Sequence, residues 1–307
     1  MPLLVGGEAL GPCPSTRSFI EKHGARYQAD AAALRAQPVR TVGPEGLVYL
    51  HQGEMAATEP TDDATWLLGS EEATTCHLVV LRHSGSGAVC LGHFDGSGTA
   101  RGARAVVDHV LALSPTQSPG RLELHVIGGF EDERSISQRL TLDVLDAFSQ
   151  QEEEIHLVTF CASELNDELR EGHHWPVIYG IAVDVRAGSL FRARFPDKGP
   201  DRALRNSRNH GDNEMGVMYC RARGELTVQP IAWTRWHNVA LWLVQPDDVI
   251  RQFLSTSPLV EPPDFAANVR QLMRFMLLHP EPSDAIFPGG AARRYRRDPH
   301  GSWQRVP

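Results

Sequence analysis

Cys76 and His93 are the two side chains whose types and spacing best suit covalent chemistry in this sequence. Residues 77–81 form an apolar run, residues 84–87 a glycine-rich turn, and residues 88–91 a second apolar run. This pattern predicts a β-hairpin that folds Cys76, just before the first strand, back beside His93, just after the second. A neighbouring imidazole can ionise a thiol into the nucleophilic thiolate. The sequence therefore predicts a cysteine nucleophile with a histidine base.

Each member of this pair also has a simpler structural explanation. A cysteine before an apolar strand is often a small core side chain, and His93 could be a surface histidine at a strand end. Two other histidines compete with His93. His77 is expected to point to the opposite face of the strand from Cys76, and His83 lies near the turn, where we expect it to be solvated. These four residues lack zinc-site spacing, so we predict no metal.

Polar residues around the thiol are candidates for substrate binding. Thr75 places a hydroxyl and a backbone amide beside Cys76, which suits the stabilisation of an oxyanion. Glu71, Glu72 and Asp95 are acidic residues near the hairpin that could bind a cationic group of the substrate. The sequence does not select among these three carboxylates.

The elements that must position these residues are many short strands and a few helices. Residues 132–150 give the clearest helix, because Ile136, Leu140, Val144 and Phe148 form one apolar stripe. The pattern predicts an α+β fold, a sandwich with mostly antiparallel sheets and helices packed alongside. We expect a single elaborated domain over residues 1–307, with 280–307 as a C-terminal arm. Further strands are expected at 47–51, 121–127, 154–162, 177–185, 190–195, 226–231 and 239–244, and further helices at 99–113, 246–254 and 266–278.

Composition restricts the class of protein. The 307 residues carry a net charge of −8 at pH 7, which argues against a nucleic-acid partner because phosphate recognition needs a basic face. No stretch reaches the roughly 20 apolar residues of a membrane-spanning helix, and the N-terminus lacks the basic region of a signal peptide. The five cysteines are scattered without CxxC spacing, as free thiols in a reducing compartment would be. We therefore expect a cytoplasmic or nuclear protein that binds neither nucleic acid nor membrane.

Several long segments carry a more specific signal. They are TVGPEGLVYL (41–50), LLGSEEATTCHLVVLRH (67–83), RLELHVIGGF (121–130), EEEIHLVTFCASELND (152–167), PVIYGIAVDV (176–185) and STSPLVEPPDF (255–265). In these segments the chain resembles the eukaryotic protein N-terminal asparagine amidohydrolase family, and the resemblance covers nearly the whole chain. It departs from the family in residues 6–40, in 200–224 and in the C-terminal arm, to which the sequence assigns no role.

The resemblance implies both a fold and a set of site residues. The implied fold is an α-β-β sandwich with helices on one side, similar to chemoreceptor glutamine deamidases and cytotoxic necrotizing factor deamidases. Those relatives carry a cysteine on one strand, a histidine further along, and an upstream polar third member. Here the resemblance selects Cys76, His93 seventeen residues later, and Ser70 six residues before the cysteine.

The resemblance also implies an activity. The family hydrolyses the side-chain amide of N-terminal Asn to give N-terminal Asp and ammonia, and this product marks a protein for ubiquitin-dependent degradation through the N-degron pathway. We expect a thioester on Cys76, no cofactor, a monomeric enzyme, and partners that are proteins or peptides bearing N-terminal Asn. Two alternatives stay open: a non-catalytic module that binds peptide N-termini, and a different cysteine hydrolase such as a protein glutamine deamidase.

Overall fold

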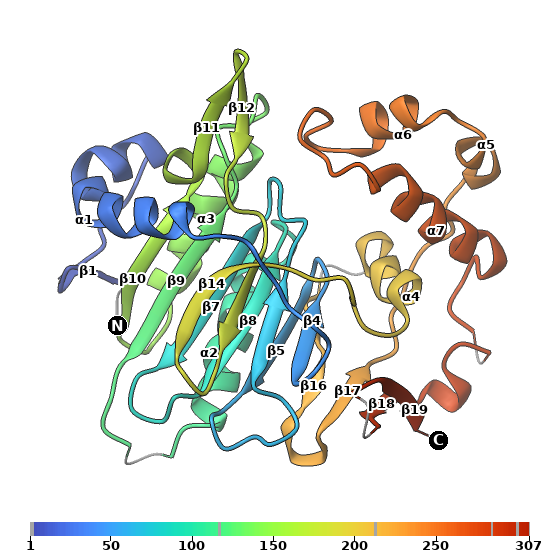
Figure 1. The fold of residues 1–307 in the computed structure, drawn as a ribbon, viewed down its shortest axis with the longest axis horizontal. Helices are drawn as coiled ribbons and strands as arrows, with labels where there is room; N and C mark the ends of the chain where they lie inside the picture. The colour runs from blue at the N-terminus through green and yellow to red at the C-terminus, as the bar shows by residue number, and fades with distance from the viewer. Residues whose placement is uncertain (1–2, 116–117, 212–213, 284, 299–300, 307) are drawn as a thin grey trace.

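Three stacked layers form the centre of the molecule: helices α1–α3, an eight-stranded sheet and a five-stranded sheet (Figure 1). Most strand pairs are antiparallel, and parallel pairs occur in both sheets. The α+β class predicted from the sequence is confirmed. The structure is a computed structural model that describes residues 3–115, 118–211, 214–283, 285–298 and 301–306.

The larger sheet has the strand order β15-β5-β8-β7-β9-β10-β1-β2. The predicted hairpin is β7 and β8, and β7 also pairs with β9, so the hairpin lies inside the sheet and not at an edge. The strands are β1 (Leu3–Val5), β2 (Glu8–Ala9), β5 (Glu54–Thr58), β7 (His77–His83), β8 (Val89–Phe94), β9 (Leu122–Gly128), β10 (Ile155–Ala162) and β15 (Gly216–Val217).

The five-stranded sheet packs against the opposite face of the larger sheet from the helices, in the order β3-β14-β13-β6-β4. Its central strands β13 and β6 are antiparallel, and β4 runs parallel to β6. The strands are β3 (Arg40–Thr41), β4 (Leu47–Leu50), β6 (Leu67–Ser70), β13 (Ile181–Asp184) and β14 (Ser189–Arg194).

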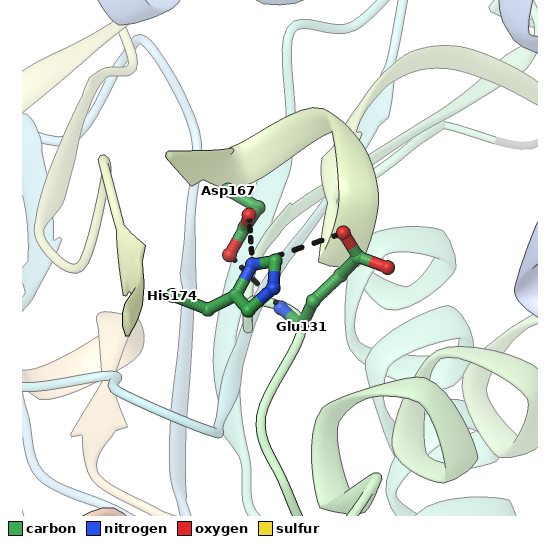
Figure 2. A group of neighbouring side chains, drawn as sticks. All are labelled: Glu131, Asp167 and His174. Carbon is green, nitrogen blue, oxygen red and sulfur yellow. Dashed lines mark hydrogen bonds and ion pairs between the residues drawn. The ribbon is translucent and has the colours of Figure 1, made fainter. Parts of the chain in front are cut away.

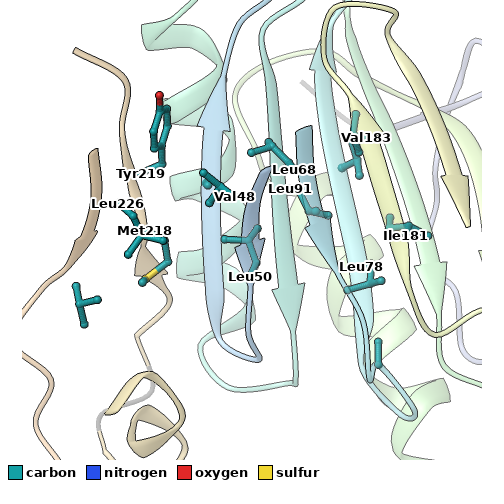
Figure 3. Packing of buried hydrophobic residues seen from close by; sticks show 14 of the residues in the cluster. Val48, Leu50, Leu68, Leu78, Leu91, Ile181, Val183, Met218, Tyr219 and Leu226 are labelled. Atoms are coloured by element: carbon teal, nitrogen blue, oxygen red, sulfur yellow. The ribbon is translucent and has the colours of Figure 1, made fainter. Parts of the chain in front are cut away.

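Strand β7 serves two cores at once. Leu78 and Val80 pack toward the five-stranded sheet (Figure 3), whereas Val79 and Leu81 pack toward the helices. This alternation follows from the two-residue period of a strand. Full burial of each such side chain contributes about 1.5–3 kcal/mol, so a strand that is apolar on both faces is stable only in the middle layer.

Three helices cover the helix-side core of the larger sheet. Val106, Val107 and Val110 of one helix and Leu140 and Val144 of the next are all buried against it. The third, N-terminal helix packs along β10. These helices are α1 (Thr16–Ala36), α2 (Thr99–Ala112) and α3 (Ile136–Ser149).

A second group of helices, here called the helical lobe, lies beside the three layers (Figure 1), and its Leu204, Leu272 and Met276 belong to the same buried cluster as side chains of the two sheets. Its short helices α4, α5 and α6 all pack against α7. The strand expected at 239–244 is wrong, because residues 239–243 form a helix that packs on α7. The helices are α4 (Arg202–Asn206), α5 (Val239–Leu243), α6 (Asp247–Leu254) and α7 (Phe265–Leu278).

The segment expected to be a C-terminal arm contributes strands to a small sheet of order β16-β17-β18-β19. A separate hairpin, β11–β12, projects beyond the layers (Figure 1). None of the described helices combines the length and the apolar character needed to cross a membrane. These strands are β11 (Asp167–Arg170), β12 (His173–Pro176), β16 (Tyr219–Cys220), β17 (Glu225–Val228), β18 (Arg293–Arg297) and β19 (Trp303–Val306).

Candidate active site

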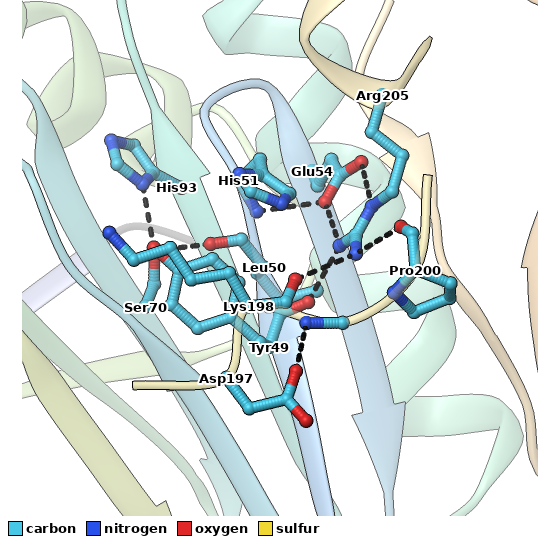
Figure 4. A network of polar contacts seen from close by, with 11 residues as sticks. Tyr49, Leu50, His51, Glu54, Ser70, His93, Asp197, Lys198, Pro200 and Arg205 are labelled. Atoms are coloured by element: carbon cyan, nitrogen blue, oxygen red, sulfur yellow. Dashed lines mark hydrogen bonds and ion pairs between the residues drawn. The ribbon is translucent and has the colours of Figure 1, made fainter. Parts of the chain in front are cut away.

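Ser70 and His93 meet where the two large sheets pack against each other. Ser70 is the last residue of β6, and its Oγ lies 2.8 Å from Nδ1 of His93 on β8 (Figure 4). The Ser70 hydroxyl donates its single hydrogen to the carbonyl of Leu50, over 2.7 Å. It therefore accepts a hydrogen from Nδ1 of His93, which leaves Nε2 as the unprotonated nitrogen of the neutral ring.

Cys76 lies directly before β7, on the same face of the sheet as His93. In the β7–β8 register Leu78 is opposite His93, so Cys76, two residues earlier, is the diagonal neighbour of His93. Both side chains line one cavity of about 370 Å³. Nε2 of His93 is buried without a hydrogen-bond partner among the described residues. Nε2 therefore forms no hydrogen bond with the Cys76 thiol in this structure, and its lone pair is not used by another described group.

Burial sets the charge states of this pair. It raises the pKa of the Cys76 thiol well above its ordinary range, and the carboxylates of Asp95 and Glu261 raise that pKa further. Burial also lowers the pKa of His93 to about 4, against the opposing effect of Asp95 and Glu54. At neutral pH the resting pair is therefore a neutral thiol and a neutral imidazole. Such a pair can react by proton transfer as the sulfur attacks.

Residues on the helical-lobe side line the same cavity as the thiol. Thr75, Cys76 and His93 line it from the larger sheet and the loop before β7, and Trp236 and Leu272 line it from the lobe. The cavity thus lies between a β-sheet that carries the reactive groups and a set of helices that faces them. A chain terminus that enters this space is surrounded on several sides.

Known proteins resemble this chain over its full length. Residues 37–305 match the family model described as protein N-terminal asparagine amidohydrolase. Proteins of that name from Sus scrofa and Homo sapiens are each 42% identical over 306 residues, which cover 100% of this chain and 98% of theirs. The chain belongs to the protein N-terminal asparagine amidohydrolase family. A more distant relative of the same name, from Arabidopsis thaliana, is 25% identical over 84% of this chain and 80% of its own.

Two of the acidic residues predicted from the sequence are already paired in this amidohydrolase-family chain. Nζ of Lys198 lies 2.8 Å from the carboxylate of Glu71 and also pairs with Glu72. Arg202 lies 3.7 Å from the carboxylate of Glu72. The carboxylates of Glu71 and Glu72 are therefore neutralised locally by basic side chains of the segment before and within α4.

Thr75 and Asp95 line the cavity beside Cys76. Oγ1 of Thr75 lies 3.0 Å from Oγ1 of Thr256, which ties the loop before β7 to the lobe. The Asp95 carboxylate accepts hydrogen bonds from the Gln52 side chain at 2.9 Å and from the amide of Ser97 at 2.7 Å. Asp95 is thus hydrogen-bonded within the loops next to the site, where it adds negative charge.

Most residues that line the cavity were not predicted from the sequence, and Glu261 and His51 are two ionisable examples. Glu261 lies between α6 and α7, 185 residues after Cys76, and its segment STSPLVEPPDF was available only as part of the family resemblance. His51 follows β4 and is buried, and burial and nearby cations lower its pKa well below the ordinary value. Neither position carries a local motif that points to a site.

A buried ion pair stabilises the end of β4, where the carbonyl of Leu50 accepts the Ser70 hydroxyl. Arg205 of α4 and Glu54 of β5 are both fully buried, and Nη2 of Arg205 lies 2.5 Å from Oε2 of Glu54 (Figure 4). The Glu54 carboxylate also accepts the amide of His51, and Arg205 donates to the carbonyl of Tyr49. These bonds fix the chain on both sides of Leu50, whose carbonyl receives the Ser70 hydroxyl.

The competing histidines lie elsewhere. His77 points to the helix side, as expected, and its Nε2 lies 2.6 Å from the Thr141 hydroxyl. The expectation that His83 is solvated is wrong. Nδ1 of His83 accepts the amide of Ser86, and the packed hairpin turn buries the ring. Because His77 and Cys76 lie on opposite faces, the four residues considered for zinc do not converge.

Glu131, Asp167 and His174 form another titratable cluster, beside the β11–β12 hairpin (Figure 2). Nδ1 of His174 lies 2.6 Å from the Asp167 carboxylate, and this hydrogen bond raises the pKa of His174. Asp167 also accepts the amide of Glu131. The ion pair between His174 and Asp167 lies within the hairpin, and the hydrogen bond from the Glu131 amide joins the hairpin to the β9–α3 loop. These contacts account for the cluster.

Proposed function

We propose that this protein hydrolyses the side-chain amide of N-terminal Asn on proteins and peptides, giving N-terminal Asp and ammonia. One observation carries the proposal: His93 is hydrogen-bonded through Nδ1 to Ser70, its Nε2 has no hydrogen-bond partner among the described residues, and its side chain lines the same cavity as Cys76. Membership of the asparagine amidohydrolase family supports the choice of substrate. The proposal assigns Cys76 as nucleophile, His93 as base and acid, and Ser70 as the residue that orients His93.

In the first half of the reaction, the Cys76 sulfur attacks the side-chain carbonyl carbon of Asn. Nε2 of His93 takes the thiol proton as the carbon–sulfur bond forms, because the pKa of Cys76 is too high for a stable resting thiolate. The tetrahedral intermediate then breaks its carbon–nitrogen bond. His93 gives the proton to the departing nitrogen, which leaves as ammonia, and a thioester remains on Cys76.

Backbone amides next to the nucleophile are suited to hold the oxyanion of that intermediate. The amide of Ala73 donates to the carbonyl of Tyr179, and the amide of Thr74 donates to the carbonyl of Glu72. These bonds hold the loop before β7 in place. We therefore assign the oxyanion to the next two amides, those of Thr75 and Cys76, which are preorganised by the same loop.

Water completes the reaction. His93 removes a proton from a water molecule, whose oxygen attacks the thioester carbon. The carbon–sulfur bond breaks and the side-chain carboxylic acid of Asp forms. His93 returns the proton that it took from water to the Cys76 sulfur, and the carboxylic acid releases its own proton to solvent. The proposal includes the biological consequence that the family resemblance implies: N-terminal Asp marks the protein for degradation through the N-degron pathway.

Ammonia release tests the activity directly. Matched peptides that begin with Asn, Gln or acetyl-Asn are incubated with the wild-type protein, Cys76→Ala and His93→Ala. We expect release from the Asn peptide only, and a loss of at least about 1,000-fold in both variants. Intact-mass detection of an acyl-enzyme would confirm the covalent step.

The same assay separates the alternatives. Release from Gln peptides in preference to Asn peptides would identify a glutamine deamidase instead. Peptide binding without ammonia release by the wild-type protein would identify a binding module. Unchanged release by Cys76→Ala would overturn the assigned mechanism.

A further inference from the structure

Within the described part of the chain, Glu261 and Asp95 are the cavity carboxylates that form no ion pair, and both oxygens of Asp95 already accept hydrogen bonds. Glu261 lies in the loop between α6 and α7 and lines the same cavity as Cys76. We infer that Glu261 binds the free α-ammonium of the substrate and is the residue that restricts the reaction to a chain terminus. This inference rests on the proposed function, since it assigns a recognition step to that same site.

The first support is that Glu261 lacks a cationic partner. Its carboxylate accepts a hydrogen bond from Ser255 at 2.5 Å, but within the described part of the chain it forms no ion pair. Burial and the nearby Glu72 raise its pKa to about 7, and the Arg251 guanidinium opposes this effect only weakly. A half-buried carboxylate without a cation is unfavourable, and a bound ammonium would supply the missing charge.

The second support comes from the other carboxylates of the cavity, which already have partners. Glu71 and Glu72 pair with Lys198. Asp95 accepts two hydrogen bonds from neighbouring loop residues. An ammonium that bound Glu71 or Glu72 would compete with the directly paired Lys198, whereas at Glu261 the Arg251 guanidinium acts electrostatically but forms no ion pair among the described residues.

The third support is electrostatic. The negative charge of Glu261 acts on Cys76 and raises the pKa of its thiol, together with Asp95. An ammonium bound at Glu261 offsets that charge, so it favours loss of the thiol proton when substrate is present. An Asn inside a chain has a neutral amide in place of the ammonium, and an acetylated Asn likewise has no positive charge there. The same carboxylate therefore both selects the terminus and ties thiol activation to its arrival.

The test compares two substrates that differ only in the α-amino group. One is a peptide that begins with Asn, and the other carries the same peptide with a succinamoyl group, which is Asn without its α-amino group. Ammonia release is measured from both with the wild-type protein and Glu261→Gln, an isosteric change that removes the charge. Asp264→Asn is the matched control, because Asp264 is exposed, lies three residues away and bonds the Asn268 side chain.

We expect the wild-type kcat/KM to be about 10- to 100-fold higher for the Asn peptide, as a charge-assisted hydrogen bond in a half-buried site implies. In Glu261→Gln the Asn peptide should fall to the rate of the succinamoyl peptide, so that the ratio approaches one. Asp264→Asn should keep the wild-type ratio. Partial recovery of the ratio in Glu261→Asp would confirm that the charge matters.

Several outcomes would overturn the inference while leaving the proposed function intact. One is an unchanged ratio in Glu261→Gln, with Cys76→Ala inactive. Another is collapse of the ratio in Glu72→Gln and not in Glu261→Gln, which would move the ammonium site to Glu72. If the wild-type protein releases no ammonia from the Asn peptide, the proposed function itself fails. If Glu261→Gln does not fold, the wild-type protein still provides a test. Equal kcat/KM values for the Asn and succinamoyl peptides would contradict the inference.

Discussion

Ser70 of the five-stranded sheet accepts the Nδ1 hydrogen of His93 of the eight-stranded sheet, so one hydrogen bond joins the two sheets and fixes the tautomer of the His93 ring. The register of neither sheet alone sets this bond. It depends on how the sheets pack, through the apolar side chains that fill the space between them. The orientation of the His93 ring therefore depends on the packing of the whole sandwich.

Replacement of Ser70 by Ala should lower kcat more than it changes KM. The ring of His93 would lose its acceptor at Nδ1 and could adopt the other tautomer, so we expect a loss of about 10- to 100-fold in kcat. Nitrogen NMR of the His93 ring reports the tautomer directly. Ser189→Ala, an exposed change on β14 of the same sheet, is the control. A Ser70→Ala protein with the wild-type tautomer and wild-type kcat would contradict the assigned role.

Removal of Arg205 should destabilise the protein strongly. Arg205→Ala leaves the buried carboxylate of Glu54 without a partner, and we expect a loss of about 3–5 kcal/mol in the free energy of unfolding. The pair formed by the exposed Arg121 with the partly buried Glu123 is the comparison, since Arg121→Ala should cost at most about 1 kcal/mol. Denaturant titration measures both. Equal effects of the two substitutions would show that burial of the Arg205 pair is unimportant.

Cys76 should react slowly with a neutral alkylating agent until the pH is high. Burial and two nearby carboxylates raise the pKa of this thiol, so the thiolate fraction at pH 7 is small. Iodoacetamide labelling of Cys76, followed by peptide mass spectrometry from pH 5 to pH 10, should show a rate that rises throughout and has no plateau at low pH. A plateau beginning near pH 5 would instead indicate a resting thiolate–imidazolium pair.

Glu261 should make stability fall as the pH rises. The pKa of its carboxyl is raised from 4.5 to about 7 in the folded protein, so its favourable contribution is complete below pH 4.5 and is lost between 4.5 and 7. The rise corresponds to an upper limit of about 3 kcal/mol. Glu261→Gln should therefore match the wild type in unfolding free energy near pH 4.5 and exceed it at pH 8. A constant difference across this range would contradict the raised pKa.

Activity should have a matching pH dependence. The wild-type kcat/KM for Asn peptides should rise through pH 7 as Glu261 ionises, and fall near pH 8 as a peptide α-amine with a pKa of about 7.7–8.0 loses its proton. Glu72, Arg251 and the Cys76 thiol also face this carboxylate, so the variant profile is needed. In Glu261→Gln the limb near pH 7 should disappear. Its persistence would assign that limb to another group.

The sequence predicted the part of the site that is local. The hairpin that carries Cys76 and His93 follows from apolar periodicity and a glycine-rich turn, and strand period alone predicted that His77 faces away. Ser70 came from the family resemblance, because no local pattern places β6 opposite β8. Its contact with His93 exists only once the sheets have packed.

The remaining differences arise from tertiary packing. The sequence could not show that Glu71 and Glu72 are paired, because their partner Lys198 is more than 120 residues away. The run at 239–244 has the composition of a strand, but it packs on α7 and is helical. Glu261 stands in a loop whose position over the thiol depends on the whole helical lobe.

The neutral, partly buried thiol of Cys76 has a consequence for the lifetime of the enzyme. Peroxide oxidises thiolates much faster than thiols, and exposed low-pKa cysteines are the first to form sulfenic acid. A nucleophile that gives up its proton only during attack spends little time in the vulnerable form.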